Sequence, residues 1–186
     1  FEVSIDVIEP SNKEYMMNIP LVTVSPRLSA FGRLVLLTGS LTMASHATAD
    51  YKVTAYEATP GYKALMAADY EAAAKASPVP GTSVNRFAIT SNRCVAEVQL
   101  GDLKAALSTC NSALGEFSAY QSFTYLPGNR RQEKASLLSN RGVVLALQGQ
   151  IAEAEGDFVQ ALKYNPEHAN ARANLELLRA RMVGQR

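Results

Sequence analysis

The chain has few of the residues that catalysis and metal binding require. Its 186 residues include two histidines, two cysteines and no tryptophan, and 18 Lys+Arg nearly balance 17 Asp+Glu. A metal site needs three or four ligands, and a nucleic-acid-binding protein needs a concentrated basic face. No glycine-rich phosphate loop occurs, and no serine or cysteine has a histidine partner in a recognisable motif. The composition therefore predicts a non-enzyme without cofactor or metal, and it gives no reason to expect a nucleic-acid partner.

Two further polar features are interpreted as surface. His168 follows Asn165-Pro166, which ends a predicted helix, so we expect an exposed residue at the start of the next one. Glu153, Glu155 and Asp157 alternate along a predicted helix, which indicates a solvated face. A paired-carboxylate hydrolase would have to hold two such acids at a set separation.

Residues 17–49 have the features of a secretory signal peptide. Two arginines and no acids precede the mostly apolar run 34–44, and Ala47-Thr48-Ala49 is a small-x-small cleavage site. A membrane-spanning helix needs about 20 apolar residues, and small or polar residues interrupt this shorter run. We therefore expect cleavage near Ala49, a mature chain that begins at Asp50, and no membrane span in that chain.

Residues 1–16 show no helical or strand pattern that connects to the rest of the chain. Lys13-Glu14 can be encoded as AAGGAG, a bacterial ribosome-binding sequence, just before Met16 or Met17. We therefore expect residues 1–16 to be upstream sequence that was translated by mistake. Other codons at Lys13 and Glu14 in the gene would remove this argument.

Residues 91–114 and 139–162 are two copies of one pattern and are identical at 8 of 24 aligned positions. In the second copy the apolar residues of 134–147 fall at helical spacing, and Gly149-Gln150 interrupts them. A second helix is predicted over 151–164, where Asn165-Pro166 ends it because proline cannot continue a helix. Each copy is therefore a predicted helix-turn-helix unit, and stacked units of this kind usually bind partners.

The second copy resembles the tetratricopeptide repeat. The spacing of large apolar residue, glycine, alanine, aromatic residue, alanine and proline in that family is matched here by Leu138, Gly142, Leu145, Ala154, Phe158, Ala161 and Pro166. The first copy is more divergent, with Cys94 at the glycine and Cys110 at the aromatic position. The copies are offset by 48 residues, so extra residues around 115–131 should lengthen a helix and add a loop at Pro127-Gly128-Asn129.

The resemblance implies an all-α fold, a short tetratricopeptide-like stack of helical hairpins (an α-solenoid). We expect clear repeats at 84–116 and 132–166, a degenerate unit at 61–76 and a capping helix at 167–185, together forming one domain over 61–186. Residues 50–60 are predicted to be an extended N-terminal segment. This segment could cap the stack or add to a partner, and the sequence does not decide between the two.

Cys94 and Cys110 are placed on the facing helices of the first hairpin. A disulfide between them is expected if the protein is exported to an oxidising compartment, provided that their Cα atoms lie within about 7 Å. The alternative is two buried thiols that act as small apolar residues.

In tetratricopeptide proteins the first helix of each unit lines a groove, where an asparagine often contacts an extended peptide. Asn92, Asn140 and Asn174 fall at corresponding points of three successive first helices, and an amide offers both donors and an acceptor to a peptide backbone. The alternative is that these side chains bond to neighbouring loop backbone and stabilise the stack. The full predicted groove is Asn92, Asn140, Asn174, Ser91, Ser139, Val95, Val143 and Gln99.

The aromatic residues Phe117, Tyr120, Phe123 and Tyr125 are a second candidate contact surface, although they could simply cover the edge of the core. The sequence therefore predicts a periplasmic or secreted module that presents its groove to a protein or peptide. It is similar to small signal-bearing tetratricopeptide proteins of Gram-negative bacteria. The alternative is a structural subunit that forms homo-oligomers through exposed repeat ends, since such ends remain open unless capped.

Overall fold

The computed structural model describes residues 4–8, 50–78, 86–119 and 127–184. The chain divides into two units, one made of residues 1–11 and 49–186 and the other of residues 12–48. All described residues belong to the first unit. The predicted signal peptide, residues 17–49, lies outside the described residues. Among the helices that the structure describes, none combines the length and the apolar content that a membrane crossing requires.

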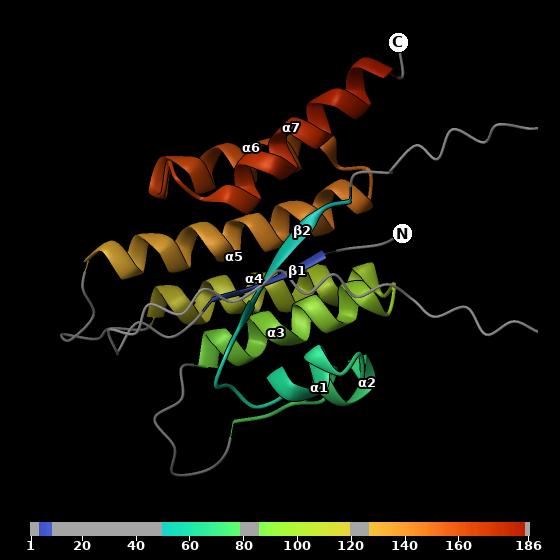
Figure 1. Ribbon diagram of the computed structural model, residues 1–186, viewed down its shortest axis with the longest axis vertical. Helices are drawn as coiled ribbons and strands as arrows, with labels where there is room; N and C mark the ends of the chain where they lie inside the picture. Colours follow the sequence, from blue (N-terminus) through green and yellow to red (C-terminus); the bar gives the residue numbers. More distant parts are fainter. Residues whose placement is uncertain (1–3, 9–49, 79–85, 120–126, 185–186) are drawn as a thin grey trace, which may run out of the picture. The chain divides into compact units, whose positions relative to one another are not determined.

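Two helical hairpins form the centre of the first unit (Figure 1). The first hairpin packs α3 (Arg86–Gln99) against α4 (Leu103–Ala119), and the second packs α5 (Pro127–Leu147) against α6 (Ile151–Tyr164). Gly101 and Gly149 follow the first helix of each hairpin, with φ angles of 77° and 79°. Glycine adopts this left-handed conformation without a steric penalty, so it allows each first helix to end in a tight turn.

Further helices lie at both ends of the two hairpins. The short helices α1 (Tyr62–Met66) and α2 (Tyr70–Ala74) pack against α3, and α7 (Ala169–Gly184) packs against α5 and α6. The residues that the structure describes therefore form seven helices arranged as successive hairpins with one unpaired helix at the end. This arrangement confirms the prediction of an all-α, tetratricopeptide-like stack.

Close contacts between small and large residues hold the second hairpin together. Ala154 and Ala161 on α6 are fully buried. A methyl group on Gly142 of α5 would lie 2.6 Å from Cε1 of Phe158 on α6. Because carbon atoms of real side chains do not approach so closely, the Phe158 ring fits against α5 only where α5 has a glycine.

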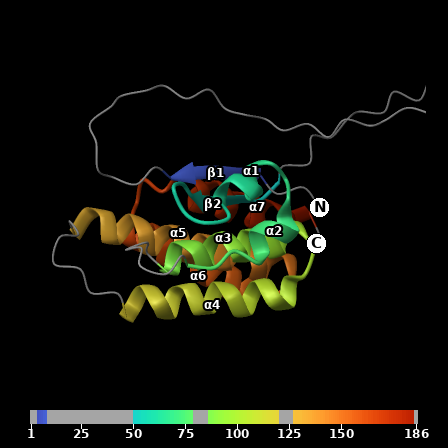
Figure 2. The same ribbon diagram turned by 90° about the horizontal axis from the view of Figure 1, so that it is seen from below.

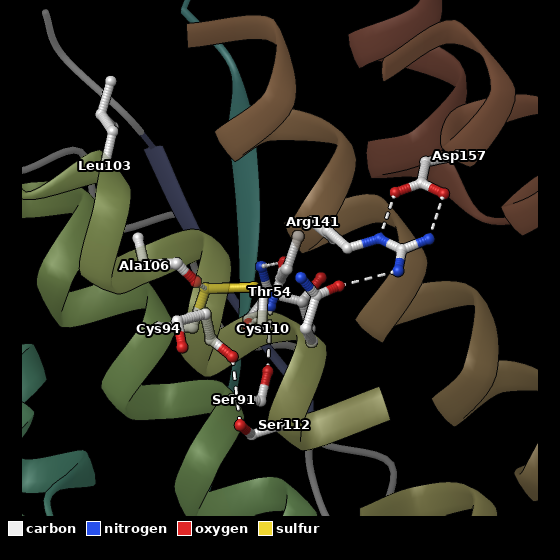
Figure 3. Close-up of a disulfide and its surroundings, with 12 residues drawn as sticks. Thr54, Ser91, Cys94, Leu103, Ala106, Cys110, Ser112, Arg141 and Asp157 are labelled. Atoms are coloured by element: carbon white, nitrogen blue, oxygen red, sulfur yellow. Dashed lines mark hydrogen bonds and ion pairs between the residues drawn. A yellow bond between two sulfur atoms is a disulfide. The ribbon is translucent and has the colours of Figure 1, made fainter. Parts of the chain in front are cut away.

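The first hairpin has a covalent bond where the second has this glycine–aromatic contact. Cys94 on α3 and Cys110 on α4 form a disulfide with their Cα atoms 5.3 Å apart, as Figure 3 shows. Both residues are buried. The predicted disulfide is therefore confirmed in the structure, and the alternative of two free thiols does not hold there. The two cysteines are 16 residues apart in sequence, and closing a loop of this size stabilises a fold by about 3 kcal/mol.

One extended segment crosses the helical stack. β2 (Lys52–Tyr56) contacts α3, α5 and α7 on the side that we call the inner face. Figure 2 shows β2 on one side of the layer formed by α3 and α5, and α4 on the opposite side of that layer. The helices α3, α5 and α7 are the first helices of successive units, so the strand passes over the same part of each unit in turn.

Two details of the predicted secondary structure were wrong. The expected loop at Pro127-Gly128-Asn129 is the first turn of α5. Proline is favourable there because the first residue of a helix has no intrahelical partner for an N–H group.

The second error concerns the N-terminal residues, to which no strand was assigned. β1 (Ser4–Ile8) is a strand that pairs with β2 in parallel, in a register from Ser4 opposite Lys52 to Ile8 opposite Tyr56. The signal was present, because Val3, Ile5 and Val7 alternate with polar residues.

Candidate functional site

Three asparagines of the inner face bind the backbone of β2. In each case the side-chain Oδ1 accepts a hydrogen bond from a backbone N–H, and Nδ2 donates one to the carbonyl oxygen of the same residue. All six distances are 2.7 or 2.8 Å. The pairs are Asn92 with Tyr56, Asn140 with Thr54, and Asn174 with Lys52. We call these three residues the asparagine ladder.

The geometry of the asparagine ladder follows from the alternation of a β-strand. In an extended chain every second residue directs its N–H and C=O groups to the same edge. An asparagine amide offers an acceptor and a donor side by side, so it binds to that edge much as the backbone of a neighbouring strand would. Three asparagines from the first helices of three successive units therefore bind the backbone of a five-residue strand, independently of its side chains.

The serines of the predicted groove connect the asparagine ladder from one unit to the next. The second hydrogen of Nδ2 on Asn140 points to Oγ of Ser91 at 3.2 Å, and that of Asn174 points to Oγ of Ser139 at 3.4 Å. Asn92 uses its remaining hydrogen on Oγ1 of Thr59 at 2.8 Å, just beyond the strand. Every polar hydrogen of the three amides thus has a partner, as buried amides require.

Apolar contacts seal the inner face beneath β2. Val53 and Ala55 belong to one buried cluster with Val95 and Val143, and no more than 1% of the surface of any of the four is exposed. The three asparagines are equally buried. Gln99, the last residue of α3, is half-buried. The structure thus brings the predicted asparagines, serines and valines together, but it places them under a segment of the same chain, so another protein could reach them only if β2 left.

Aromatic and polar side chains fix both ends of the strand. The Tyr51 ring stacks on Phe158 with centroids 6.4 Å apart, and the Arg181 guanidinium lies 4.8 Å from the Tyr51 ring. Burial raises the pKa of Tyr51, an effect that the nearby charge of Arg181 opposes. At the other end Tyr56 meets Phe87 edge to face.

Sequence reasoning missed these contacts, together with the hydrogen bond from Asn170 to Oγ1 of Thr54. A signal for the strand was nevertheless available. Residues 51–56 read Tyr-Lys-Val-Thr-Ala-Tyr, a run rich in aromatic and β-branched residues.

His168 was predicted to be exposed, and this prediction was wrong. Only 4% of His168 is exposed, because it precedes α7 and lies against α5. Its Nδ1 accepts from the backbone N–H of Ala171 at 3.1 Å, and its Nε2 lies 3.0 Å from Oγ of Ser136. Because the Ser136 hydroxyl donates to the Gln132 carbonyl, Nε2 is the donor to Ser136 and the ring is neutral. Burial lowers the pKa of His168, which keeps the ring in that state.

The prediction of a solvated acidic face was wrong for Asp157. Its carboxylate is buried and receives two hydrogen bonds of 2.7 Å from Arg141, one from Nε and one from an NH2 group, as Figure 3 shows. The bidentate pair raises the pKa of Arg141 further, because the hydrogen bond favours the charged form. Arg141 also donates to Oδ1 of Asn111 on α4. This set of contacts joins α4, α5 and α6. Of the other predicted surface acids, Glu153 is exposed as expected.

The aromatic candidate surface is described in part. Phe117 is buried and contacts Phe87 edge to face at 5.0 Å, with the Arg130 guanidinium 4.7 Å from its ring centroid. It therefore covers the core, which was the second of the two readings. Tyr120, Phe123 and Tyr125 lie outside the described residues.

Residues 135–168, which span most of α5 and all of α6, match the tetratricopeptide repeat family model. The protein therefore contains a tetratricopeptide repeat. Such a repeat suggests a protein–protein interaction module and is typically non-catalytic. No curated protein and no solved structure matches the chain. Across the described ranges no three His, Cys, Asp or Glu side chains are grouped so that they could hold a metal ion.

Proposed function

We propose that this protein is an exported, non-catalytic interaction module that binds a protein or peptide partner at its inner face. The observation that carries the proposal is the tetratricopeptide repeat at residues 135–168, because repeats of this family suggest protein–protein interaction; the asparagine ladder adds to it by holding β2 in place across the inner face. The strand β2 belongs to the recognition surface as well, since it covers the groove. A partner therefore meets a composite surface of helices and strand.

Export to the periplasm or secretion fits two features of the chain. Cleavage of the predicted signal peptide 17–49 near Ala49 would leave Asp50 as the first residue, two residues before β2 begins. The disulfide between Cys94 and Cys110 suits an oxidising compartment, because the cytosol keeps thiols reduced. On this proposal residues 1–16 are upstream sequence and are also absent from the mature protein.

The first test is to express the full chain with a C-terminal tag in a Gram-negative bacterium and isolate the periplasm. We expect a mature N-terminus at Asp50 and one protein that co-purifies in stoichiometric amount, both identified by mass spectrometry. An intact N-terminus with recovery from the cytosol alone would contradict export.

A matched pair of variants then locates the contact. The Lys52 side chain is exposed on β2, and Lys104 is exposed on α4 in the other layer. Lys52→Glu should weaken retention of the partner, whereas Lys104→Glu should not. The opposite result would place the partner on the outer layer and contradict the inner-face proposal. Asn140→Ala provides a further check, since unchanged partner binding with lowered stability would assign the asparagine ladder a structural role alone.

A second candidate function is a structural subunit that assembles through the ends of the stack. Exposed apolar residues favour it: Met66 of α1 is 40% exposed at one end, and Met182 and Val183 of α7 are 38% and 75% exposed at the other. Size measurement by light scattering across micromolar concentrations separates the two candidates. A monomer throughout the range favours the interaction module, and growth in size with concentration favours the structural subunit.

A further inference from the structure

The strand β2 has two edges, and the helices bind one of them. Lys52, Thr54 and Tyr56 direct their backbone groups to the asparagine ladder. By the alternation of a strand, Val53 and Ala55 direct theirs to the opposite edge. We call this opposite edge the outer edge of β2. In the structure the outer edge is covered by β1, which pairs with β2 over five residues in parallel.

β1 is attached to the molecule chiefly through β2. Its main contact among the described elements is β2. The half-buried side chain of Ile5 also packs against the buried cluster that contains Val53 and Ala55. Figure 2 shows β1 next to β2, on the side away from α3 and α5. Removing β1 would therefore leave the helices and the asparagine ladder in place, and would expose the backbone groups of Val53 and Ala55 at the outer edge.

We infer that the outer edge of β2 is an acceptor site for an extended segment of a partner protein, which adds as a parallel strand. β1 is the occupant of this site within the chain itself. The inference rests on the proposed function, because export with cleavage near Ala49 would remove β1 from the mature protein. The strand-addition mode supplies affinity through backbone hydrogen bonds and specificity through alternate side chains.

The register of β1 defines the chemistry of the partner segment. It is an extended stretch of about five residues, long enough to pair along all of β2. It carries an apolar side chain at the position opposite Val53, where Ile5 packs against the core. The partner segment has no proline at the position of Asp6. In the parallel pattern the backbone of that residue pairs with backbone groups of both Val53 and Ala55, and its N–H must donate one of those hydrogen bonds.

The test uses the full chain and a fluorescent peptide of residues 2–10, EVSIDVIEP. Asp6→Pro in the full chain removes the central one of the N–H groups through which β1 pairs, so β1 should release the outer edge. The matched control Asp6→Asn retains that N–H and should leave β1 in place. Fluorescence anisotropy should show that the peptide binds the Asp6→Pro chain at least ten-fold more tightly than wild type or Asp6→Asn. The reason is that in wild type and Asp6→Asn the peptide must compete with β1 of the same chain, whose pairing is intramolecular.

The same peptide with its own Asp6→Pro change should not bind any of the proteins. If the normal peptide fails to bind the Asp6→Pro chain while far-ultraviolet circular dichroism shows intact helices, the inference is wrong. Dimerisation of that chain without peptide binding would also overturn it, because the outer edge would then pair with a second copy.

A second arm covers the case in which Asp6→Pro does not fold. A specific protease site placed within residues 12–48 of the wild-type chain allows the link to β1 to be cut after folding. The cut protein should exchange its N-terminal fragment for the labelled peptide, and the uncut protein should exclude it. Absence of exchange, together with loss of the fragment from the cut protein, refutes the inference. Peptide binding does not depend on where the cell places the protein, so this result and the export result can fail separately.

Discussion

Replacing Asn140 by alanine tests whether the asparagine ladder holds β2 on the helices. The Asn140 amide makes two hydrogen bonds of 2.8 Å to the backbone of Thr54 and one of 3.2 Å to Ser91. Asn140 and Thr54 are 1% and 2% exposed. Alanine therefore leaves both backbone groups of Thr54 without their partner in a place that water does not reach.

The expected loss of stability follows from these two groups. A buried donor or acceptor without a partner costs about 1–3 kcal/mol, so the pair predicts a loss of about 2–6 kcal/mol in the free energy of unfolding. The lower end applies if β2 shifts and lets water reach Thr54. Because single domains are stable by about 5–15 kcal/mol, the change should be large enough to measure and could approach the total.

Urea unfolding followed by circular dichroism at 222 nm measures this loss. Asn111→Ala is the matched control, because Asn111 is an exposed asparagine on α4 that accepts one hydrogen bond from Arg141. Substitution of a surface residue usually changes stability by less than about 0.5 kcal/mol. Asn140→Asp is a second comparison of nearly the same shape. It keeps an acceptor for the N–H of Thr54 but turns a carboxylate oxygen toward the Thr54 carbonyl, so it should also destabilise the protein.

The result that would refute this reasoning is an Asn140→Ala protein as stable as Asn111→Ala. It would mean that β2 contributes nothing through Asn140, and that the strand is held by apolar burial alone. A stable Asn140→Asp protein would point the same way, since the opposed oxygens would then have been free to move apart.

Three further predictions concern the helices. Reducing the disulfide between Cys94 and Cys110 should lower the free energy of unfolding by about 3 kcal/mol, measured by urea unfolding with and without reductant. Burial lowers the pKa of His168 in the folded protein, so on acidification the unfolded state binds the proton first. The free energy of unfolding should therefore decrease as the pH drops below about 6.5, by at most about 1.4 kcal/mol per pH unit. Gly142→Ala should destabilise by about 1–3 kcal/mol, because its methyl group would overlap the ring of Phe158.

Each of these has its own control. Replacing both cysteines by alanine should abolish the effect of reductant, and a persistent effect would show that reductant acts elsewhere. His168→Asn keeps a side-chain acceptor for the helix start but has no titrating ring. An equal loss of stability at low pH in this variant would show that His168 is not the cause of the loss. Gly156→Ala is the comparison for Gly142, because a methyl group at Gly156 meets nothing within 4 Å. Equal effects of the two glycine substitutions would contradict the packing argument.

The helical hairpins could be predicted because their signals are local. Apolar residues at helical spacing, Gly149 after the first helix and Pro166 after the second act within a few residues of where they stand. The pairing of Cys94 with Cys110 could be inferred in the same way, since two antiparallel helices joined by a short turn place those positions opposite each other.

The two errors about burial have a common physical origin. His168 and Asp157 were assigned to the surface from the pattern of their own segments, but α5 covers both of them. Burial of a polar side chain depends on whether a distant element offers it a partner. The pattern of one helix does not contain that information.

The sequence by itself determined the two helical hairpins, the turns at Gly101 and Gly149 within them, and that Asn92, Asn140 and Asn174 occupy the same position in three successive units. Only the tertiary structure decided what these asparagines bind. Their partners in β2 lie 36, 86 and 122 residues away in the sequence. A strand can reach all three at once only after the helices have packed side by side in one orientation, and that packing arises from the whole stack.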